Sequence, residues 1–316
     1  MTKPASTKTA STKTVVVLMG GRSAEREVSL DSGRACAAAL KEAGYQVTCL
    51  EVTDDISALT KALSPKPDAV LNALHGRWGE DGCIQGLLEL LRIPYSHSGV
   101  LASALANDKQ ATKHLVASVG IISPSGVVVD LAELRKGDVM ERPYVVKPVC
   151  EGSSVGVHIV HKGDNEPPVW ANDWVFGQQV LVEEYIPGRE LTVAVMGDRA
   201  LTVTEIKPKV DFYDYRAKYT DGQAEHILPA DLPESISKQA LNAAVGAHQA
   251  LGCRGVSRSD FRYDDTETSP GRLVYLETNT QPGMTALSLV PEQAEHLGIS
   301  FPELCSWMVE HARCDS

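Results

Sequence analysis

The 316-residue sequence lacks several features that would place it in a specialised class. It has no apolar run of the roughly 18 residues that a membrane helix requires, so we expect no membrane span. Its seven cysteines are odd in number and form no Cys-x-x-Cys pair, which favours reduced thiols in a cytoplasm. Residues 1–13 are rich in Ser, Thr and Lys without the apolar core of an export signal, and this predicts a disordered tail.

Positive charge is scarce as well. The chain has 30 Lys and Arg residues against 41 Asp and Glu residues, a formal net charge of −11. Because nucleic acid requires a basic surface, this balance argues against a nucleic-acid partner. It leaves open a small anion such as a nucleotide, provided that a few positive side chains gather locally. The length and the ordinary apolar fraction of 43% allow two or more domains with a sizeable core.

The common nucleotide-binding motifs are also missing. No G-x-G-x-x-G follows the first predicted strand, residues 15–19, and no G-x-x-x-x-G-K-[ST] occurs, so neither a Rossmann site nor a P-loop is expected. A helix over residues 30–43 and a strand over 45–50 complete a βαβ unit. Ligands bind at the carboxyl ends of such strands. Glu25, in the first loop, is therefore a candidate for binding a cationic group, and a solvated loop acid is the alternative.

Three further segments have the composition of binding loops. A predicted strand at 69–73 runs into HGRWGEDG, which has more glycines and ionisable side chains than a turn requires. A strand at 144–148 places Lys147 before a Gly/Ser loop whose amides and hydroxyls could cover phosphates. Residues 208–229 show no clear period and are predicted to be a lid. The remaining predicted elements are helices at 84–91, 103–119, 234–251 and 291–312 and strands at 157–160, 180–186, 190–195 and 201–206.

Residues 252–283 are predicted to form a hairpin that carries a metal site. One strand contains Arg258 and Asp260, and the return strand runs through 273–276 into Glu277 and Asn279. If the strands pair, Asp260 faces Glu277, and Asn279 lies on the same face as Glu277. Two carboxylates and an amide are oxygen ligands of the kind that Mg²⁺ and Mn²⁺ take. The alternative is an acidic hairpin tip in solvent.

Four segments resemble the D-alanine–D-alanine ligase family of the ATP-grasp superfamily: HGRWGEDGCIQG, VVKPVCEGSSVGV, FYDYRAKY and RSDF…YLETNTQPGMTALSLVP. The resemblance extends over residues 14–311 and implies an α+β fold. It implies an N-terminal α/β parallel-sheet domain (14–100), a central ATP-grasp domain (101–187) and a C-terminal ATP-grasp domain (188–316). The implied activity is the ATP-dependent ligation of two D-alanine molecules through an acyl phosphate, for peptidoglycan synthesis. The resemblance also implies a homodimer.

The resemblance further implies roles for individual residues. In the family pattern, ATP would be bound together with two Mg²⁺ or Mn²⁺ ions, and the metal ligands would be Asp260, Glu277 and Asn279. The nucleotide would be bound by Lys109, Lys147, Ser154, Glu183, Glu184, Ile186, Glu190 and Lys218.

The same pattern implies two D-alanine subsites. Glu25 would pair with the first ammonium group, and His75 would lie near the first carboxylate. Arg258 and the Gly283 amide would face the developing oxyanion. The second D-alanine would be received by Lys218, Ser288 and Leu289, and a triad of Glu25, Ser153 and Tyr219 would close the lid.

The chain departs from the family pattern at three positions. Glu184 stands where a lysine beside the adenine is usual, which places that side-chain contact in doubt. Ser259 and Thr278 replace apolar residues and are expected to point away from the metal face. Two other functions stay open: a related ATP-grasp ligase for a different amino acid, and a catalytically silent nucleotide or amino-acid sensor.

Overall fold

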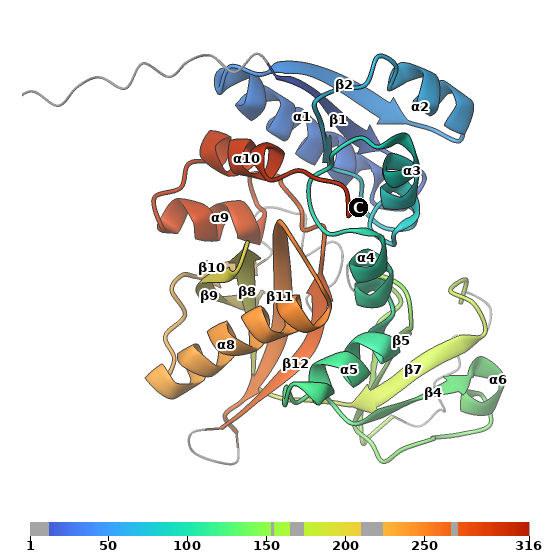
Figure 1. Ribbon diagram of the computed structural model, residues 1–316. Coiled ribbons are helices and arrows are strands. Elements are labelled where there is room, and N and C mark those ends of the chain that lie inside the picture. Colours follow the sequence, from blue (N-terminus) through green and yellow to red (C-terminus); the bar gives the residue numbers. More distant parts are fainter. Residues whose placement is uncertain (1–12, 153–154, 165–173, 210–223, 267–270, 316) are drawn as a thin grey trace, which may run out of the picture.

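The computed structural model describes residues 13–152, 155–164, 174–209, 224–266 and 271–315. The first layer is a parallel sheet of order β2-β1-β3 (Figure 1), built from β1 Thr14–Gly20, β2 Gln46–Val52 and β3 Ala69–Asn72. Alternate residues of β1 point to opposite faces, and both faces are covered. Val15 and Val17 pack with α1 (Arg26–Glu42), whereas Val16 and Leu18 pack with residues of α2 (Ile56–Ala62) and α3 (Cys83–Leu91).

Two short helices replace the single helix expected over residues 103–119, so that expectation was wrong. The structure has α4 at Val100–Asn107 and α5 at Lys109–Ser118. Asp108 separates them in an extended conformation, and its side chain accepts a hydrogen bond from the Ala111 N–H at 2.9 Å. An aspartate in this position caps a new helix. Lys109 is therefore the first residue of α5.

The central layer is a four-stranded antiparallel sheet of order β4-β7-β5-β6. Its apolar face is buried by Leu134, Tyr144 and Val182, among others. The sheet consists of β4 Gly126–Asp130, β5 Tyr144–Pro148, β6 His158–Val160 and β7 Gln179–Glu184, and the short helix α6 Leu131–Leu134 follows β4.

The third layer is a five-stranded antiparallel sheet of order β10-β9-β8-β11-β12, and α8 (Glu234–Ala250) packs on one of its faces (Figure 1). One strand lies within the segment expected to be a lid without regular structure, which corrects that expectation for residues 224–227. The strands are β8 Arg189–Met196, β9 Arg199–Pro208, β10 Ala224–Ile227, β11 Val256–Asp264 and β12 Arg272–Asn279.

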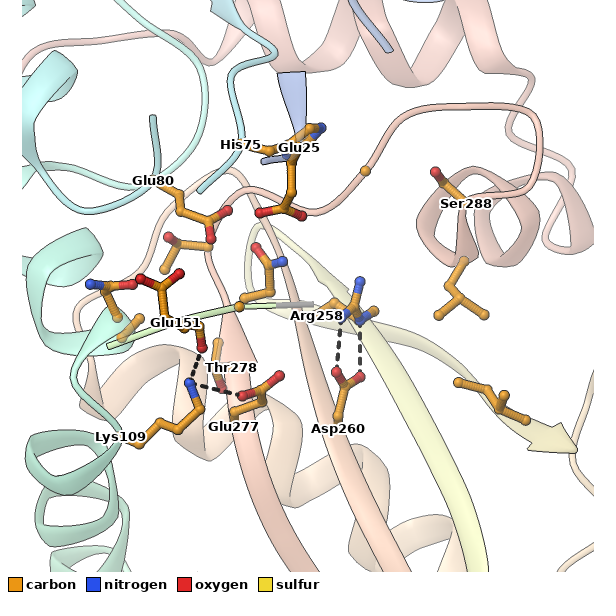
Figure 2. Close-up of a pocket in the computed structure, with 18 of the residues that line it drawn as sticks. Glu25, His75, Glu80, Lys109, Glu151, Arg258, Asp260, Glu277, Thr278 and Ser288 are labelled. Carbon is orange, nitrogen blue, oxygen red and sulfur yellow. Dashed lines mark hydrogen bonds and ion pairs between the residues drawn. The ribbon is translucent and has the colours of Figure 1, made fainter. Parts of the chain in front are cut away.

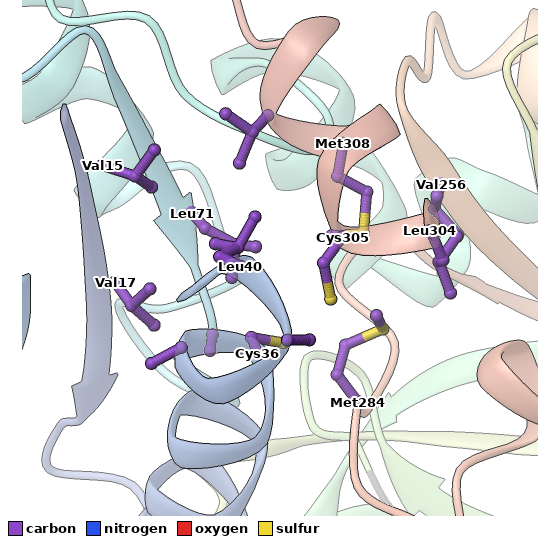
Figure 3. Close-up of a cluster of buried hydrophobic side chains, with 14 of the residues drawn as sticks. Val15, Val17, Cys36, Leu40, Leu71, Val256, Met284, Leu304, Cys305 and Met308 are labelled. Atoms are coloured by element: carbon purple, nitrogen blue, oxygen red, sulfur yellow. The ribbon is translucent and has the colours of Figure 1, made fainter. Parts of the chain in front are cut away.

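The C-terminal segment forms two helices rather than the single helix expected over 291–312. They are α9 Leu289–His296 and α10 Phe301–Glu310. Ser300 and Glu303 form a reciprocal capping box that starts α10. Helix α10 returns to the first layer and packs on α1, where Cys36 and Leu40 meet Cys305 and Met308 (Figure 3). This contact joins the end of the described chain to its beginning.

Candidate active site

A cleft between the sheets contains two adjoining cavities. The larger, of about 540 Å³, is lined by residues of both antiparallel sheets, including Lys147 on β5 and Glu190 on β8, and by Ile186 between β7 and β8. The smaller, of about 80 Å³, also reaches the loops that follow β1 and β3, through Glu25 and His75. Figure 2 shows this smaller cavity. The residues that line both cavities are Lys109, Glu151, Gly152, Glu190, Ile206 and Glu277.

The expected hairpin of β11 and β12 is present, and its expected register is confirmed. Asp260 pairs with Glu277, and Arg258 pairs with Asn279. The next pair beyond Asp260 is Phe261 with Tyr275, so Leu276 is an extra residue and forms a bulge. Asp260, Glu277 and Asn279 all line the smaller cavity.

The two facing carboxylates, Asp260 and Glu277, are each paired with a cation. Arg258 donates two hydrogen bonds to Asp260, at 2.9 and 2.8 Å, and Thr192 donates a third at 2.6 Å. The Lys109 ammonium lies 3.5 Å from Glu277 and donates to the Glu151 carbonyl (Figure 2). Among the described residues, no group of three or more His, Cys, Asp or Glu side chains is close enough to bind a metal ion. The expected ligand set differs from such a group because it contains only two carboxylates and an amide.

The hydroxyls of Ser259 and Thr278 are bonded within the core, and only Thr278 also lines the smaller cavity. Their hydroxyl oxygens are 2.8 Å apart, and the Tyr275 hydroxyl donates to Thr278 at 2.6 Å. In a regular strand, residues three apart lie on opposite faces. The bulge at Leu276 brings Tyr275 and Thr278 to the same side, and their hydroxyls bond to each other in the core, although Thr278 also lines the smaller cavity.

A buried charge cluster borders the larger cavity. Glu183 is 3% exposed and forms ion pairs with Lys147 and with Lys113, the latter at 2.8 Å. Burial disfavours ionisation of Glu183, but the two lysines outweigh this effect and its pKa is lowered. Sequence reasoning assigned no role to Lys113, although its spacing of four residues from Lys109 on one helix was a usable signal.

Two residues beside the linker between the two antiparallel sheets were expected to border the adenine, and one of them, Glu184, stands where the family pattern has a lysine. Ile186 is buried and lines the larger cavity. The Glu184 carboxylate instead accepts hydrogen bonds from Arg272 at 2.6 Å and Ser125 at 3.1 Å. Glu184 thus links the central sheet to β12 in addition to lining the cavity. Glu190 also lines the cavity, 3.7 Å from the Arg262 guanidinium.

The loops that follow β1 and β3 bring Glu25 and His75 together. Both are buried, at 7% and 5% exposure, and His75 lies 3.3 Å from the Ser32 hydroxyl. Burial lowers the pKa of His75, which favours the neutral imidazole. Glu80 shares the wall of the cavity and was not singled out from the sequence. Burial, followed by the charge of Glu25, raises the pKa of Glu80 to about 8.

The other end of the smaller cavity is formed by Gly283, Ser288 and Leu289. Ser288 directly precedes α9, and its hydroxyl accepts a hydrogen bond from the Thr285 N–H at 2.9 Å. A Cβ atom on Gly283 would lie 2.9 Å from that hydroxyl, so glycine permits the close approach. The expected site residues Ser153, Ser154, Lys218 and Tyr219 lie outside the described residues.

Comparison with known proteins identifies the family. A model described as "D-ala D-ala ligase C-terminus" matches residues 130–310, and one described as "D-ala D-ala ligase N-terminus" matches residues 53–98. A D-alanine–D-alanine ligase from Granulibacter bethesdensis is 58% identical over 304 residues, covering 96% of this chain and 99% of the relative. One from Acidiphilium cryptum is 59% identical over 302 residues, with the same two coverages.

Solved structures agree with this assignment. A D-alanine–D-alanine ligase from Bacillus anthracis superposes with a TM-score of 0.80 at 33% identity, covering 94% of this chain and 96% of the other. The Bacillus anthracis enzyme complexed with ATP superposes with a TM-score of 0.78 at 33% identity, covering 95% and 96%. The expected α+β ATP-grasp fold is thereby confirmed. This chain belongs to the D-alanine–D-alanine ligase family.

Proposed function

We propose that this protein joins two D-alanine molecules to D-alanyl-D-alanine at the expense of ATP, releasing ADP and phosphate for peptidoglycan synthesis. The observation that carries the proposal is the convergence in one cleft of two lysines and a pair of facing carboxylates, with Glu25 and His75 in the same smaller cavity as those carboxylates. Relatives that carry this ligase name are aligned over almost their entire length. The two adjoining cavities of the cleft are the proposed sites for the nucleotide and for the amino acids.

The nucleotide is proposed to lie in the larger cavity. Lys147 and Lys109 neutralise its phosphates, and Ile186 contacts the base. Glu183, Glu184 and Glu190 border the same cavity, where Glu190 can accept hydrogen bonds from ribose hydroxyls. Lys218 and Ser154 are assigned to the nucleotide from the family pattern alone.

Two Mg²⁺ or Mn²⁺ ions are proposed to bind at the hairpin. Asp260 and Glu277 face each other across the strands, with Asn279 two residues further on, and all three offer hard oxygen donors to the cavity. This donor set fits such ions. When bound, the ions add positive charge where the phosphoryl group transfers. Arg258 and Lys109, which pair with the carboxylates in this structure, then become available to the substrates.

The chemistry divides into two steps. The carboxylate of the first D-alanine attacks the γ-phosphate of ATP and becomes an acyl phosphate, and ADP is released from the transferring group. The amine of the second D-alanine attacks the activated carbonyl, and phosphate leaves. Arg258 and the Gly283 N–H stabilise the oxyanion of the tetrahedral intermediate. Exclusion of water preserves the acyl phosphate.

Substrate positions follow from the walls of the smaller cavity. Glu25 binds the first ammonium group, and the neutral His75 lies near the first carboxylate. The second D-alanine lies beside Ser288 and Leu289. Lys218 is assigned to the second carboxylate, and Ser153 and Tyr219 to a triad with Glu25, from the family pattern.

The assembly state and the compartment are part of the proposal. Leu90 and Leu101 are 85% and 70% exposed on α3 and α4, which pack together, and such apolar side chains suit a homodimer contact. All seven cysteines are unpaired, which suits the reducing cytoplasm. No helix of the described residues is long and apolar enough to cross a membrane. Replacing both leucines with glutamate should convert dimer to monomer in light scattering.

One assay tests the activity directly. The purified protein with ATP, Mg²⁺ and D-alanine should produce D-alanyl-D-alanine, measured by mass spectrometry, together with one phosphate per dipeptide. Omission of D-alanine, or its replacement with L-alanine, is the control and should give no dipeptide. Phosphate release with a different amino acid only would indicate another ligase of the superfamily. No release with any amino acid would indicate a nucleotide-binding protein without catalysis.

A further inference from the structure

Lys113 is a charged residue that contacts Glu183, a residue of the larger cavity. Its Nζ lies 2.8 Å from Oε2 of Glu183, whereas Lys147 pairs with Oε1 of the same carboxylate. The side chains of the three residues are 13%, 3% and 8% exposed, in the order Lys113, Glu183, Lys147. Lys147 and Glu183 line the larger cavity, but Lys113 lines neither cavity. Lys113 therefore acts on a ligand only through Glu183.

Helix α5 positions this lysine together with Lys109. The two residues are four apart, so they lie on the same face of the helix. Lys109 extends to Glu277 on β12, at 3.5 Å, and Lys113 extends to Glu183 on β7. One helix face thus supplies a cation to each of the two sheets that border the nucleotide cavity.

The charges of the cluster do not cancel. Two lysines share one buried carboxylate, which leaves one positive charge in excess when both are protonated. A buried pair is strongly disfavoured once one partner is removed, because the remaining charge is then unpaired away from water. Glu183 can release Lys147 without becoming unpaired only because Lys113 stays bound to it.

We propose that Lys113 is a positioning residue for nucleotide binding, which keeps Glu183 neutralised so that Lys147 is free to bind the phosphates of ATP. The inference rests on the proposed use of ATP by this chain. It assigns Lys113 no contact with the nucleotide. Without Lys113, Lys147 becomes the sole counter-ion of Glu183, and each phosphate contact that it makes competes with that pair.

Titration behaviour is consistent with this role. Burial lowers the pKa of Lys113, and the charge of Glu183 offsets part of that effect. The lysine is therefore held in a poorly hydrated position that only its partner makes favourable. The side chain of Lys136, by contrast, is 69% exposed beside Glu133, so water can hydrate this ammonium group with or without its partner.

The test compares a charged and an uncharged ligand. Isothermal titration calorimetry would measure the affinity of the non-hydrolysable analogue AMP-PNP with Mg²⁺, and displacement titrations would measure that of adenosine. Lys113→Gln should weaken AMP-PNP binding at least about tenfold, because the phosphates lose the full charge of Lys147. Adenosine affinity should change less than about twofold, since adenosine has no phosphate. Lys113→Arg should stay close to the wild type, and Lys136→Gln serves as the surface control.

Removal of the carboxylate gives a second measurement that does not require a stable Lys113→Gln protein. In a Glu183→Gln background no buried anion competes for Lys147, so adding Lys113→Gln should leave AMP-PNP affinity unchanged. Equal AMP-PNP affinity of Lys113→Gln and wild type would overturn the inference. So would a further loss in the Glu183→Gln background, or an equal loss for adenosine. Failure of the wild type to bind AMP-PNP would instead contradict the proposed function itself.

Discussion

Replacement of Thr278 with valine tests whether the Thr278 hydroxyl stabilises the core without taking part in metal binding. Thr278 lies between Glu277 and Asn279, the proposed metal ligands, but its hydroxyl is bonded within the core. Valine has nearly the same shape and no hydroxyl. The substitution therefore removes the acceptor for the Tyr275 hydroxyl and the partner of Ser259, while the backbone of β12 can stay in place.

The expected cost follows from burial. Tyr275 is 1% exposed and Ser259 is 0% exposed, so neither hydroxyl can turn to water. A buried donor left without an acceptor costs about 1–3 kcal/mol, and an ordinary hydrogen bond contributes about 1 kcal/mol. We expect Thr278→Val to lower the free energy of unfolding by roughly 2–4 kcal/mol. Nucleotide and metal affinity should stay within about twofold of the wild type, because Glu277 and Asn279 are retained and valine keeps nearly the shape of threonine where residue 278 lines the smaller cavity.

Urea unfolding, followed by circular dichroism, measures the first quantity, and calorimetric titration of AMP-PNP with Mg²⁺ measures the second. The double variant Thr278→Val/Tyr275→Phe supplies the internal control. It should recover at least about 1 kcal/mol relative to Thr278→Val, since no unpaired tyrosine hydroxyl remains. A Thr278→Val protein as stable as wild type, or one that loses metal binding with its stability intact, would refute the reasoning.

Three other predictions concern charged groups. Glu277→Gln should nearly abolish phosphate release with D-alanine while the melting temperature changes little, and excess Mn²⁺ should restore little activity. The pKa of Glu80 is raised to about 8 in the folded protein, whereas its ordinary pKa is near 4.5. Between these two values the folded state binds a proton that the unfolded chain releases, so the stability that Glu80 contributes is lost as the pH rises. Relative to wild type, Glu80→Gln should gain roughly 2–3 kcal/mol in free energy of unfolding between pH 5 and pH 8 in urea titrations. Arg254→Met should lower the free energy of unfolding by about 3 kcal/mol in the same assay, because this buried arginine donates to the Tyr95 and Arg313 carbonyls at 3.1 and 2.7 Å. Asp315→Asn, which changes the half-exposed partner of Arg254, should lower it by less than about 1 kcal/mol.

Local patterns in the sequence were sufficient to predict most of the strands. The β-branched run at 15–19 and the one that ends in Lys147 both correspond to strands, because side-chain pattern and burial depend on neighbours close in the chain. Helix boundaries were less predictable. Apolar periodicity continued through Asp108, and only the capping bond to the Ala111 N–H shows that a new helix starts there. The domain limits near residues 100 and 187 stay predictions.

Contacts between distant segments could not be predicted from single motifs. Glu184 was recognised as a departure, but its partner Arg272 is 88 residues away on another sheet. Lys113 pairs with Glu183 across 70 residues, and the pKa of Glu80 is raised by burial and then by the charge of Glu25. Such pairings depend on how the layers pack. Spacing along the chain gives no information on that geometry.

The bulge at Leu276 allows β12 to contain this extra residue while Tyr275 still pairs with Phe261 and Glu277 still pairs with Asp260. The core requires Tyr275 to pack on Phe261, with ring centroids 5.7 Å apart. The cavity requires Glu277 to face Asp260. In a regular ladder, the register that pairs Phe261 with Tyr275 would place Leu276 opposite Asp260. The extra residue shifts the register by one, so Glu277 takes that place, and Leu276 lines the nucleotide cavity. Deletion of Leu276 should place Glu277 opposite Asp260 in a regular ladder, so metal-dependent nucleotide binding should persist. Calorimetric titration of AMP-PNP with and without Mg²⁺ measures this, and loss of the metal dependence would contradict the account of the bulge.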